Sequence, residues 1–239
     1  MPNANTLRVA AFDLDGTLTQ HKTPLGAAHR TALDRLGEHY RLLMVGAGMC
    51  ARIFEQMEHY PIDILGNYGM QFARCENGRL NMVFHETRPI DRPLVEERSM
   101  QLREALGFTQ FIGSNLEYHD SGCLTFPLLG TDAAPENKLA FDPDRSRRRL
   151  IYSTVCSAFP EYNGFIGGSS SFDFAPKPFD KYYALKRWCG QFGYSTDQVA
   201  YFGDDYGPGG NDEAVLHSDV QFVCVDDYHD FPAIAARYF

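Results

Sequence analysis

The segment from Ala10 to Gln20, AAFDLDGTLTQ, is an apolar run that stops at two acids, Asp13 and Asp15, and continues into a Gly-Thr turn. Together with the residues from Leu7 onward, this run predicts a buried strand. Buried strands of this kind belong to parallel sheets that helices cover on both sides. The strand also brings two carboxylates to one edge of the sheet, so the fold has to provide something that neutralises them.

Helix and strand patterns alternate after this first strand. Residues 41–46 and 62–65 are further apolar runs, and each follows a segment with helical spacing of its apolar residues. The expected buried helical faces comprise Ala28, Ala32, Leu33, Leu36 and Tyr40 in the first segment and Ile53, Phe54 and Met57 in the second. This order predicts an α/β fold with a parallel sheet and right-handed crossovers.

The pattern changes from residue 70. Residues 70–86 predict a β-hairpin across Asn77-Gly78, because Asn-Gly readily adopts the positive φ of a tight turn. Beyond the hairpin the sequence suggests an α+β insertion, with helices near 93–106 and 144–159 and strands near 116–120, 123–129 and 169–175.

The alternating pattern resumes with an amphipathic helix near 179–193, for which Asp180 is the expected N-cap. Its apolar face is expected to include Tyr183, Leu185, Trp188 and Phe192. Two more strands follow near 198–205 and 219–227. We therefore expect a core domain split into residues 1–85 and 176–239, with an α+β cap domain of residues 86–175 inserted between its halves.

Composition excludes several classes of protein. The net charge of -9 argues against a dedicated binder of nucleic acid or of anionic membranes, since both require a positive surface. The first residues lack the pattern of a signal peptide, and no apolar run is long enough to cross a bilayer. The cysteines include no Cys-x-x-Cys pair, which favours reduced thiols over a zinc site or disulfides. We expect a cytoplasmic protein, either a monomer or a homodimer, that binds neither nucleic acid nor membranes.

The acids lie at the ends of predicted strands. Asp13 and Asp15 follow the first strand, and Asp204 and Asp205 follow the segment VAYFG. Ligands of an open parallel sheet bind outside the carboxyl ends of its strands, where these carboxylates would repel one another unless a cation lay among them. Oxygen ligands without nearby His or Cys suit Mg²⁺.

Three motifs carry a family resemblance. FDLDGTLT, FDKYYAL and FGDDYGPGGNDEAV resemble, in order and spacing, the nucleophile, lysine and acidic motifs of the haloacid dehalogenase-like phosphatases and phosphotransferases. The resemblance implies a Rossmann-like three-layer core. Further stretches, VGAGMCARIFEQ, SNLEYHDSGCLTFP and GGSSSFDFAPKPFDK, resemble the eukaryotic-type phosphomannomutases of that superfamily. Those enzymes carry an α+β cap of the C2 type, subfamily IIB, inserted after the third strand.

The resemblance implies a catalytic role for three residues. Asp13 is expected to be the nucleophile that becomes an aspartyl phosphate, and Asp15 the general acid and base. Lys181 is expected to neutralise the phosphoryl charge and to hold Asp13. Thr17 is expected to hydrogen-bond a phosphoryl oxygen.

The resemblance also implies a Mg²⁺ site and further substrate contacts. The implied Mg²⁺ ligands are Asp13, Asp15 (through its backbone carbonyl), Asp204 and Asp212, with Asp205 as an accessory acid. Asn211 is expected to orient the phosphate, and Ser171 and Asp173 align with a segment that contacts sugar hydroxyls.

The chain departs from the family pattern at two places. The superfamily usually has a Ser or Thr after its second strand, whereas this chain reads Gly46-Ala47-Gly48-Met49, so Ala47 and Gly48 are expected to bind the phosphate through backbone N–H groups. Phosphomannomutases also carry cap arginines that hold a second phosphate. At the aligned positions this chain has His119, Gly130 and Ile166. Losing these cations disfavours a bisphosphorylated sugar, since a second phosphate needs charge-assisted donors.

Other patterns have simpler interpretations. GGSSS (167–171) more readily leads into a cap strand than it cradles a phosphate, because no helix start follows it. Arg145, Arg147, Arg148 and Arg149 are expected on a solvated helix face, with one arginine turned toward the catalytic cleft as the alternative.

The sequence therefore predicts an enzyme, a Mg²⁺-dependent phosphatase that hydrolyses a small phosphomonoester such as a sugar phosphate through an aspartyl phosphate. The alternatives are a phosphomannomutase-like phosphotransferase and a phosphosugar-binding protein with weak turnover.

Overall fold

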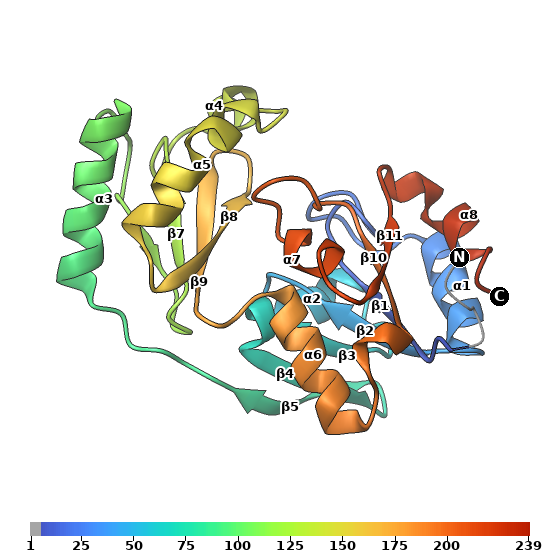
Figure 1. Ribbon diagram of the computed structural model, residues 1–239. Coiled ribbons are helices and arrows are strands. Elements are labelled where there is room, and N and C mark those ends of the chain that lie inside the picture. Colours follow the sequence, from blue (N-terminus) through green and yellow to red (C-terminus); the bar gives the residue numbers. More distant parts are fainter. Residues whose placement is uncertain (1–5) are drawn as a thin grey trace. The chain divides into compact units, whose positions relative to one another are not determined.

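The computed structural model describes residues 6–239 and divides into two compact units (Figure 1). Unit 1 comprises the chain up to Glu86 together with Asp180–Gly207 and Asp212–Phe239, and unit 2 comprises Thr87–Phe179 and Pro208–Asn211. Residues 1–5, on which part of the leader-peptide argument rests, lie outside the described residues. The sequence predicts the end of the cap after residue 175, whereas unit 2 extends to Phe179. The carbonyl of Phe179 accepts a hydrogen bond from the side chain of Asn163, which also belongs to unit 2.

Unit 1 contains a seven-stranded sheet in the order β11-β10-β1-β2-β3-β4-β5. The strands β11, β10, β1, β2 and β3 are parallel, and β4 and β5 extend this sheet as an antiparallel edge. The bounds are β1 Val9–Phe12, β2 Arg41–Val45, β3 Asp63–Gly66, β4 Gln71–Glu76, β5 Arg79–His85, β10 Val199–Gly203 and β11 Gln221–Cys224.

Helices cover both faces of this sheet. Side chains of β1 alternate, so that Ala10 and Phe12 join one apolar cluster while Val9 and Ala11 join the other. The first cluster is completed by α1 (Ala27–Gly37), α2 (Cys50–Gln56) and α8 (Phe231–Ala235), and the second by α6 (Lys181–Phe192) and α7 (Glu213–Leu216). Short 3₁₀ turns lie at Asn67–Gly69, Thr196–Gln198 and Tyr228–Asp230. The predicted Rossmann-like three-layer core is confirmed.

The buried face of α1 differs from the prediction at two residues, since Tyr40 lies beyond the helix end at Gly37 and is only half-buried. Ala28 is exposed, and His29 takes the buried position beside Ala32. A ring nitrogen of His29 lies 2.7 Å from the carbonyl oxygen of Tyr228, and its ring stacks on Phe231. A polar residue can occupy this face because its hydrogen bond is satisfied inside the protein.

The predicted hairpin is confirmed as β4 and β5. Asn77 and Gly78 have φ angles of 53° and 71°. Both lie in the left-handed region that a type I′ hairpin turn requires.

Unit 2 contains a four-stranded antiparallel sheet in the order β6-β7-β9-β8. The bounds are β6 Glu117–Tyr118, β7 Leu124–Pro127, β8 Tyr162–Gly167, β9 Ser171–Pro176, α3 Arg92–Leu106, α4 Pro135–Phe141 and α5 Ser146–Ala158. Val95 and Leu102 of α3 and Val155 of α5 pack with the sheet in one apolar cluster. The α+β architecture predicted for the cap is confirmed.

Two elements of unit 2 were not predicted. The strand β8 contains two glycines and an asparagine in the run Tyr-Asn-Gly-Phe-Ile-Gly, which weakens a strand pattern. The helix α4 has no buried residue, so it lacks the apolar period by which a helix is recognised.

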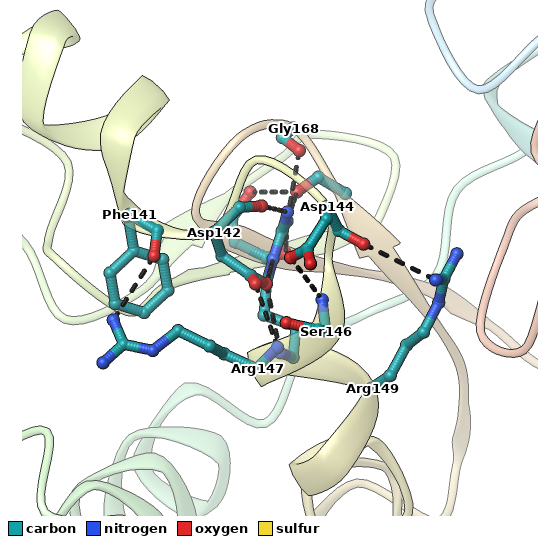
Figure 2. Close-up of polar contacts among 10 residues, drawn as sticks. Phe141, Asp142, Asp144, Ser146, Arg147, Arg149 and Gly168 are labelled. Carbon is teal, nitrogen blue, oxygen red and sulfur yellow. Dashed lines mark hydrogen bonds and ion pairs between the residues drawn. The ribbon is translucent and has the colours of Figure 1, made fainter.

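The prediction of a fully solvated arginine cluster is wrong for Arg148. Its side chain is 1% exposed and its Nε donates to the buried carboxylate of Asp142 at 2.9 Å. Its Nη1 donates to the carbonyl oxygens of Gly167, Gly168 and Ser171. Figure 2 shows Asp142 and Gly168 turned toward this network, whereas Arg147 and Arg149 point away from it. Nη2 of Arg148 donates to the carbonyl oxygen of Asp142 at 3.3 Å, so each nitrogen of this buried guanidinium has an acceptor, which compensates the cost of burying the charge.

Within residues 6–239, the helices are all too short or too polar to cross a lipid bilayer.

Candidate active site

The site lies at the carboxyl ends of β1 and β10. These strands are parallel neighbours with Phe12 opposite Phe202, so the residues that follow them emerge at the same edge of the sheet. The backbone N–H of Asp13 donates to the carbonyl of Phe202 at 2.9 Å, which extends the ladder by one residue. Asp13 and Asp204 are thereby brought together by the pairing of two strands that are distant in sequence.

Lys181 enters this site from the first residue of α6. Asp180 caps the helix by accepting a hydrogen bond from the Tyr183 N–H at 2.6 Å, as predicted. The Nζ atom of Lys181 lies 2.7 Å from Oδ1 of Asp13 and 2.7 Å from Oδ1 of Asp212, and the lysine is fully buried. A buried lysine between two carboxylates is a compensated charge.

Three carboxylates around this lysine form a group that could hold a cation. One oxygen of each of Asp13, Asp204 and Asp212 lies within 4.8 Å of the others. The donor set consists of oxygen atoms alone, which suits Mg²⁺. The excess of negative charge over the single lysine also fits a bound cation.

The turn after Asp15 packs directly on Asp204. Gly16 has φ +97°, and a Cβ at this position would lie 2.3 Å from Oδ2 of Asp204. The buried hydroxyl of Thr17 donates to Oδ1 of Asp204 at 2.9 Å. Glycine is therefore required here both for its backbone conformation and for the space it leaves to the carboxylate.

Asp212 is held by three donors. Its Oδ1 accepts from Lys181 and from the phenol of Tyr201 at 2.6 Å, and its Oδ2 accepts from the backbone N–H of Asp205. Tyr201 was not identified from the sequence. The sequence offered one signal for it. Tyr201 has a polar hydroxyl although it lies in the otherwise apolar strand that leads to Asp204.

Burial and mutual charge shift the pKa values of the clustered residues. Burial raises the pKa of Asp13 well above its ordinary value, with Asp212 and Asp204 adding to the effect against the opposing charge of Lys181. Burial and the charge of Asp212 raise the pKa of Asp204 to about 6. Burial alone would lower the pKa of Lys181, but the adjacent Asp13 and Asp212 outweigh it and raise that pKa. All three pKa shifts result from the burial of several carboxylates close to one another and to Lys181.

The side chain of Asp15 has a different environment. Its Oδ1 accepts hydrogen bonds from the Gln56 amide at 2.7 Å and from the Lys22 N–H at 2.8 Å, and its Oδ2 lies 3.5 Å from Arg52. Burial acts to raise the pKa of Asp15, but these hydrogen bonds and the charge of Arg52 lower it on balance. Asp15 is thus held apart from the group formed by Asp13, Asp204 and Asp212.

The loop after β2 contains Ala47 and Gly48. The Gly48 carbonyl accepts a hydrogen bond from Asn67 N–H at 2.7 Å, so this loop is tied to the end of β3. Cys50 N–H, at the start of α2, donates to Oε1 of Gln71. The Cys50 N–H is thus already used within the protein, and Ala47 and Gly48 stay the expected backbone donors of this loop.

Comparison with known proteins agrees with this arrangement. The family model described as "Eukaryotic phosphomannomutase" matches residues 29–226. The chain belongs to the eukaryotic phosphomannomutase family. The phosphomannomutase of Triticum aestivum is 28% identical over 233 residues, covering 88% of this chain and 86% of that protein. The phosphomannomutase of Oryza sativa subsp. indica is 29% identical over 239 residues, covering 91% and 88%.

Solved structures share the fold at low identity. The IMP-bound, N-terminally truncated IMP-nucleotidase of Plasmodium falciparum has a TM-score of 0.68 at 13% identity, covering 98% of this chain and 68% of that one. A haloacid dehalogenase-like hydrolase from Bacteroides thetaiotaomicron has a TM-score of 0.59 at 15% identity, covering 98% and 100%. The predicted membership of the haloacid dehalogenase-like superfamily, with resemblance to phosphomannomutases, is confirmed.

The remaining predicted site residues of this phosphomannomutase family member lie in unit 2. Oγ of Ser171 donates to the carbonyl of Gly167 at 3.0 Å, and Asp173 accepts from the Thr125 hydroxyl at 2.9 Å. Burial raises the pKa of Asp173. Asn211 precedes Asp212 in the chain but is grouped with unit 2. The structure thus brings together Asp13, Lys181, Thr17, Asp204 and Asp212, and the roles of the unit 2 residues stay predictions.

Two of the three positions at which phosphomannomutases carry cap arginines have little room for a long side chain. Gly130 has φ +88°, and a Cβ there would lie 2.2 Å from the carbonyl oxygen of Ile112. Ile166 is 3% exposed and packs in the apolar cluster of unit 2. The third, His119, is exposed, with a ring nitrogen 3.0 Å from the Thr125 hydroxyl. The packing of unit 2 at Gly130 and Ile166 therefore disfavours an arginine at either position.

Proposed function

We propose that this phosphomannomutase family member hydrolyses a small phosphomonoester, such as a sugar phosphate, through an aspartyl phosphate on Asp13. The observation that carries the proposal is the position of the Asp13 carboxylate, 2.7 Å from the buried Lys181 Nζ and grouped with Asp204 and Asp212. A carboxylate nucleophile beside a fixed cation is the arrangement that phosphoryl transfer requires, since the transferred group carries negative charge throughout.

In the first step, an oxygen of Asp13 attacks phosphorus and the bond between phosphorus and the substrate oxygen breaks. Asp15 donates a proton to the leaving oxygen, so the product departs as an alcohol. The hydrogen bonds to Asp15 lower its pKa in the free protein. A bound phosphoryl dianion acts in the opposite direction, because a nearby negative charge favours the protonated acid.

In the second step, water attacks the phosphorus of the aspartyl phosphate and the bond to Asp13 breaks. Asp15, now ionised, accepts the proton of that water, and inorganic phosphate leaves. Lys181 remains paired with Asp13 and Asp212 and limits the charge that accumulates around the transferred group. The Thr17 hydroxyl, which donates to Asp204 in the free protein, would turn to a phosphoryl oxygen when substrate binds, and the backbone N–H groups of Ala47 and Gly48 are the other proposed donors.

Mg²⁺ is the proposed cofactor. Asp13, Asp204 and the backbone carbonyl of Asp15 would hold it, with Asp212 as a further acid of the site. When bound, the ion would offset part of the negative charge that substrate and carboxylates share.

The second candidate is a phosphomannomutase-like phosphotransfer between two positions of one sugar. It is favoured by family membership, because the named relatives are phosphomannomutases. It is opposed by the packing at Gly130 and Ile166, where arginines that would hold a second phosphate have little room. We favour hydrolysis because water needs no second phosphate site.

The test measures release of inorganic phosphate from a panel of hexose 1-phosphates, hexose 6-phosphates and nucleoside monophosphates, each with Mg²⁺ or with EDTA. Wild type and Asp13→Asn are compared, and isomerisation of mannose 1-phosphate is followed with and without a hexose bisphosphate activator.

Phosphate release that disappears with EDTA and in Asp13→Asn supports the proposal. Isomerisation that depends on the activator, without net phosphate release, would favour the mutase. Turnover that survives in Asp13→Asn would rule out the aspartyl phosphate.

A further inference from the structure

Arg52 occupies a space that the chain leaves open after β2. The superfamily usually has a hydroxyl side chain in this loop, whereas this chain reads Gly46-Ala47-Gly48-Met49 and has no side chain at Gly48. A Cβ at Gly48 would lie only 2.4 Å from Nη2 and 2.6 Å from Nε of Arg52. The absence of a side chain at position 48 is therefore what admits the guanidinium.

The guanidinium bridges the loops that follow β1 and β2. These strands are parallel neighbours with Phe12 opposite Met44, so Asp15 and Gly48 belong to adjacent loops at one edge of the sheet. Nη2 of Arg52 lies 3.5 Å from Oδ2 of Asp15. Arg52, in the first turn of α2, therefore stands at the same edge as Asp13 and beside the loop that is expected to face the phosphoryl group.

Gln56 fixes this arrangement from one helical turn further along. Its Oε1 accepts a hydrogen bond from Nη1 of Arg52 at 2.8 Å, and its Nε2 donates to Oδ1 of Asp15 at 2.7 Å. One amide thus orients both the arginine and the proposed general acid.

The guanidinium keeps unused donors. Arginine carries five N–H bonds in a planar fork that matches a phosphate. Within residues 6–239 its only hydrogen-bond acceptors are Gln56 and, at the long distance of 3.5 Å, Asp15. The side chain is 41% exposed, so the other N–H bonds are accessible to a ligand.

We propose that Arg52 binds the phosphoryl group of the substrate, in place of the hydroxyl that the loop lacks. This inference rests on the proposed function, since it names a further residue that holds the substrate of that site. It identifies the ligand chemistry as a phosphate dianion, for which a fixed guanidinium is a stronger partner than a neutral hydroxyl.

The test uses the full chain and two probes, inorganic phosphate and the best substrate of the panel. Binding of inorganic phosphate is measured by calorimetry for wild type, Arg52→Ala, Arg52→Lys, Gly48→Ser and Gly48→Ser/Arg52→Ala. We expect Arg52→Ala to weaken phosphate binding and raise KM, each by roughly tenfold, with Arg52→Lys intermediate.

The two positions should be coupled. Gly48→Ser alone should also weaken phosphate binding, because the new Cβ displaces the guanidinium. In the Arg52→Ala background the same serine finds free space and supplies a hydroxyl, so the double variant should bind phosphate more tightly than Arg52→Ala. Arg74→Ala is the matched control, since this half-exposed arginine pairs with Asp63 at the opposite edge of the parallel strands and should not alter phosphate binding.

The outcomes separate this inference from the proposed function. If Arg52→Ala binds inorganic phosphate as tightly as wild type, Arg52 does not bind the phosphoryl group, even if the pH profile of turnover moves through its contact with Asp15. If Arg52→Ala loses phosphate binding while Asp13→Asn keeps full turnover, the result supports the contact between Arg52 and phosphate. The same result would rule out an aspartyl phosphate on Asp13.

Discussion

Nζ of Lys181 lies 2.7 Å from Oδ1 of Asp13, and the two side chains are 0% and 8% exposed. The same nitrogen lies 2.7 Å from Asp212, so a single ammonium group compensates two buried acids. Three segments that are distant in the sequence meet at this nitrogen. This geometry makes the stability of unit 1 depend on the charge state of its proposed catalytic residues.

Lys181→Met should be strongly destabilising. Removing the lysine leaves Asp13 and Asp212 buried without a counter-charge, which costs about 3–5 kcal/mol of the free energy of unfolding. Urea denaturation at neutral pH with EDTA measures this loss. Adding Asp13→Asn removes one of the two uncompensated charges. The double variant should therefore lose less stability than the sum of the two single losses, by at least about 0.5 kcal/mol. Strict additivity would contradict the pairing.

Stability should fall as the pH rises through the range in which Asp204 titrates. The pKa of Asp204 is raised to about 6 in the folded protein, whereas an unfolded aspartate titrates at about 3.9. Between these values the folded state binds more protons, so the free energy of unfolding decreases from about pH 4 to about pH 6, by on the order of 1–3 kcal/mol. Urea denaturation across this range in EDTA checks the slope. Asp204→Asn should be flatter, and an unchanged slope in that variant would assign it to other groups.

Gly16→Ala should lower stability and Mg²⁺ affinity by more than the backbone strain at a positive φ alone would cause. The substitution combines φ +97° with a Cβ 2.3 Å from Asp204. Gly78 offers a matched control, because it has φ +71° but nothing within 4 Å of an added Cβ. Gly78→Ala should cost about 1 kcal/mol of stability and leave Mg²⁺ binding intact. Gly16→Ala should cost more and weaken Mg²⁺ binding by roughly tenfold or more, as measured by calorimetry. Equal Mg²⁺ affinity in the two variants would argue against a role of Asp204 in the cation site.

Tyr201→Phe should slow turnover by holding Asp212 less firmly. The phenol lies 2.6 Å from Asp212, so its removal costs about 1 kcal/mol of stability and should reduce activity by roughly tenfold. Tyr60→Phe is the comparison, since the buried Tyr60 donates to Asp34 at 2.9 Å outside the proposed site. It should show a similar stability loss with normal turnover. A parallel loss of turnover in both variants would mean that the effect is a general one of folding.

Arg148→Met should destabilise unit 2 far more than Arg149→Met. Arg148 is buried and paired with Asp142, whereas Arg149 is exposed and donates to the Asp144 carbonyl at the long distance of 3.5 Å. We expect a loss of about 3–5 kcal/mol for Arg148→Met and a change within about 0.5 kcal/mol for Arg149→Met. Hydrogen exchange of β8 and β9 measures the effect where the arginine binds the strand carbonyls. Similar exchange rates in the two variants would show that the buried network does not stabilise this hairpin.

The sequence alone was sufficient for the α/β core, the hairpin at Asn77-Gly78 and the placement of Asp13 and Asp204 at one sheet edge. These features depend on local periodicity and on turn residues, and the parallel pairing of strands then aligns their carboxyl ends. Asp180 as a helix cap is equally local, because the cap and the amide that it binds are three residues apart.

The tertiary structure decided which polar groups meet inside the protein. Arginines 147, 148 and 149 have the same local pattern, yet only Arg148 of the three is buried, because Asp142 and the carbonyls at the β8–β9 turn surround it. Likewise Tyr201 belongs to an apolar strand by pattern, and its role follows from the position of Asp212. Arg52 enters the site because Gly48 leaves room for it. The local sequence pattern indicates whether a side chain can be buried. The partner that compensates a buried charge comes from elsewhere in the chain, so only the folded structure brings the two together.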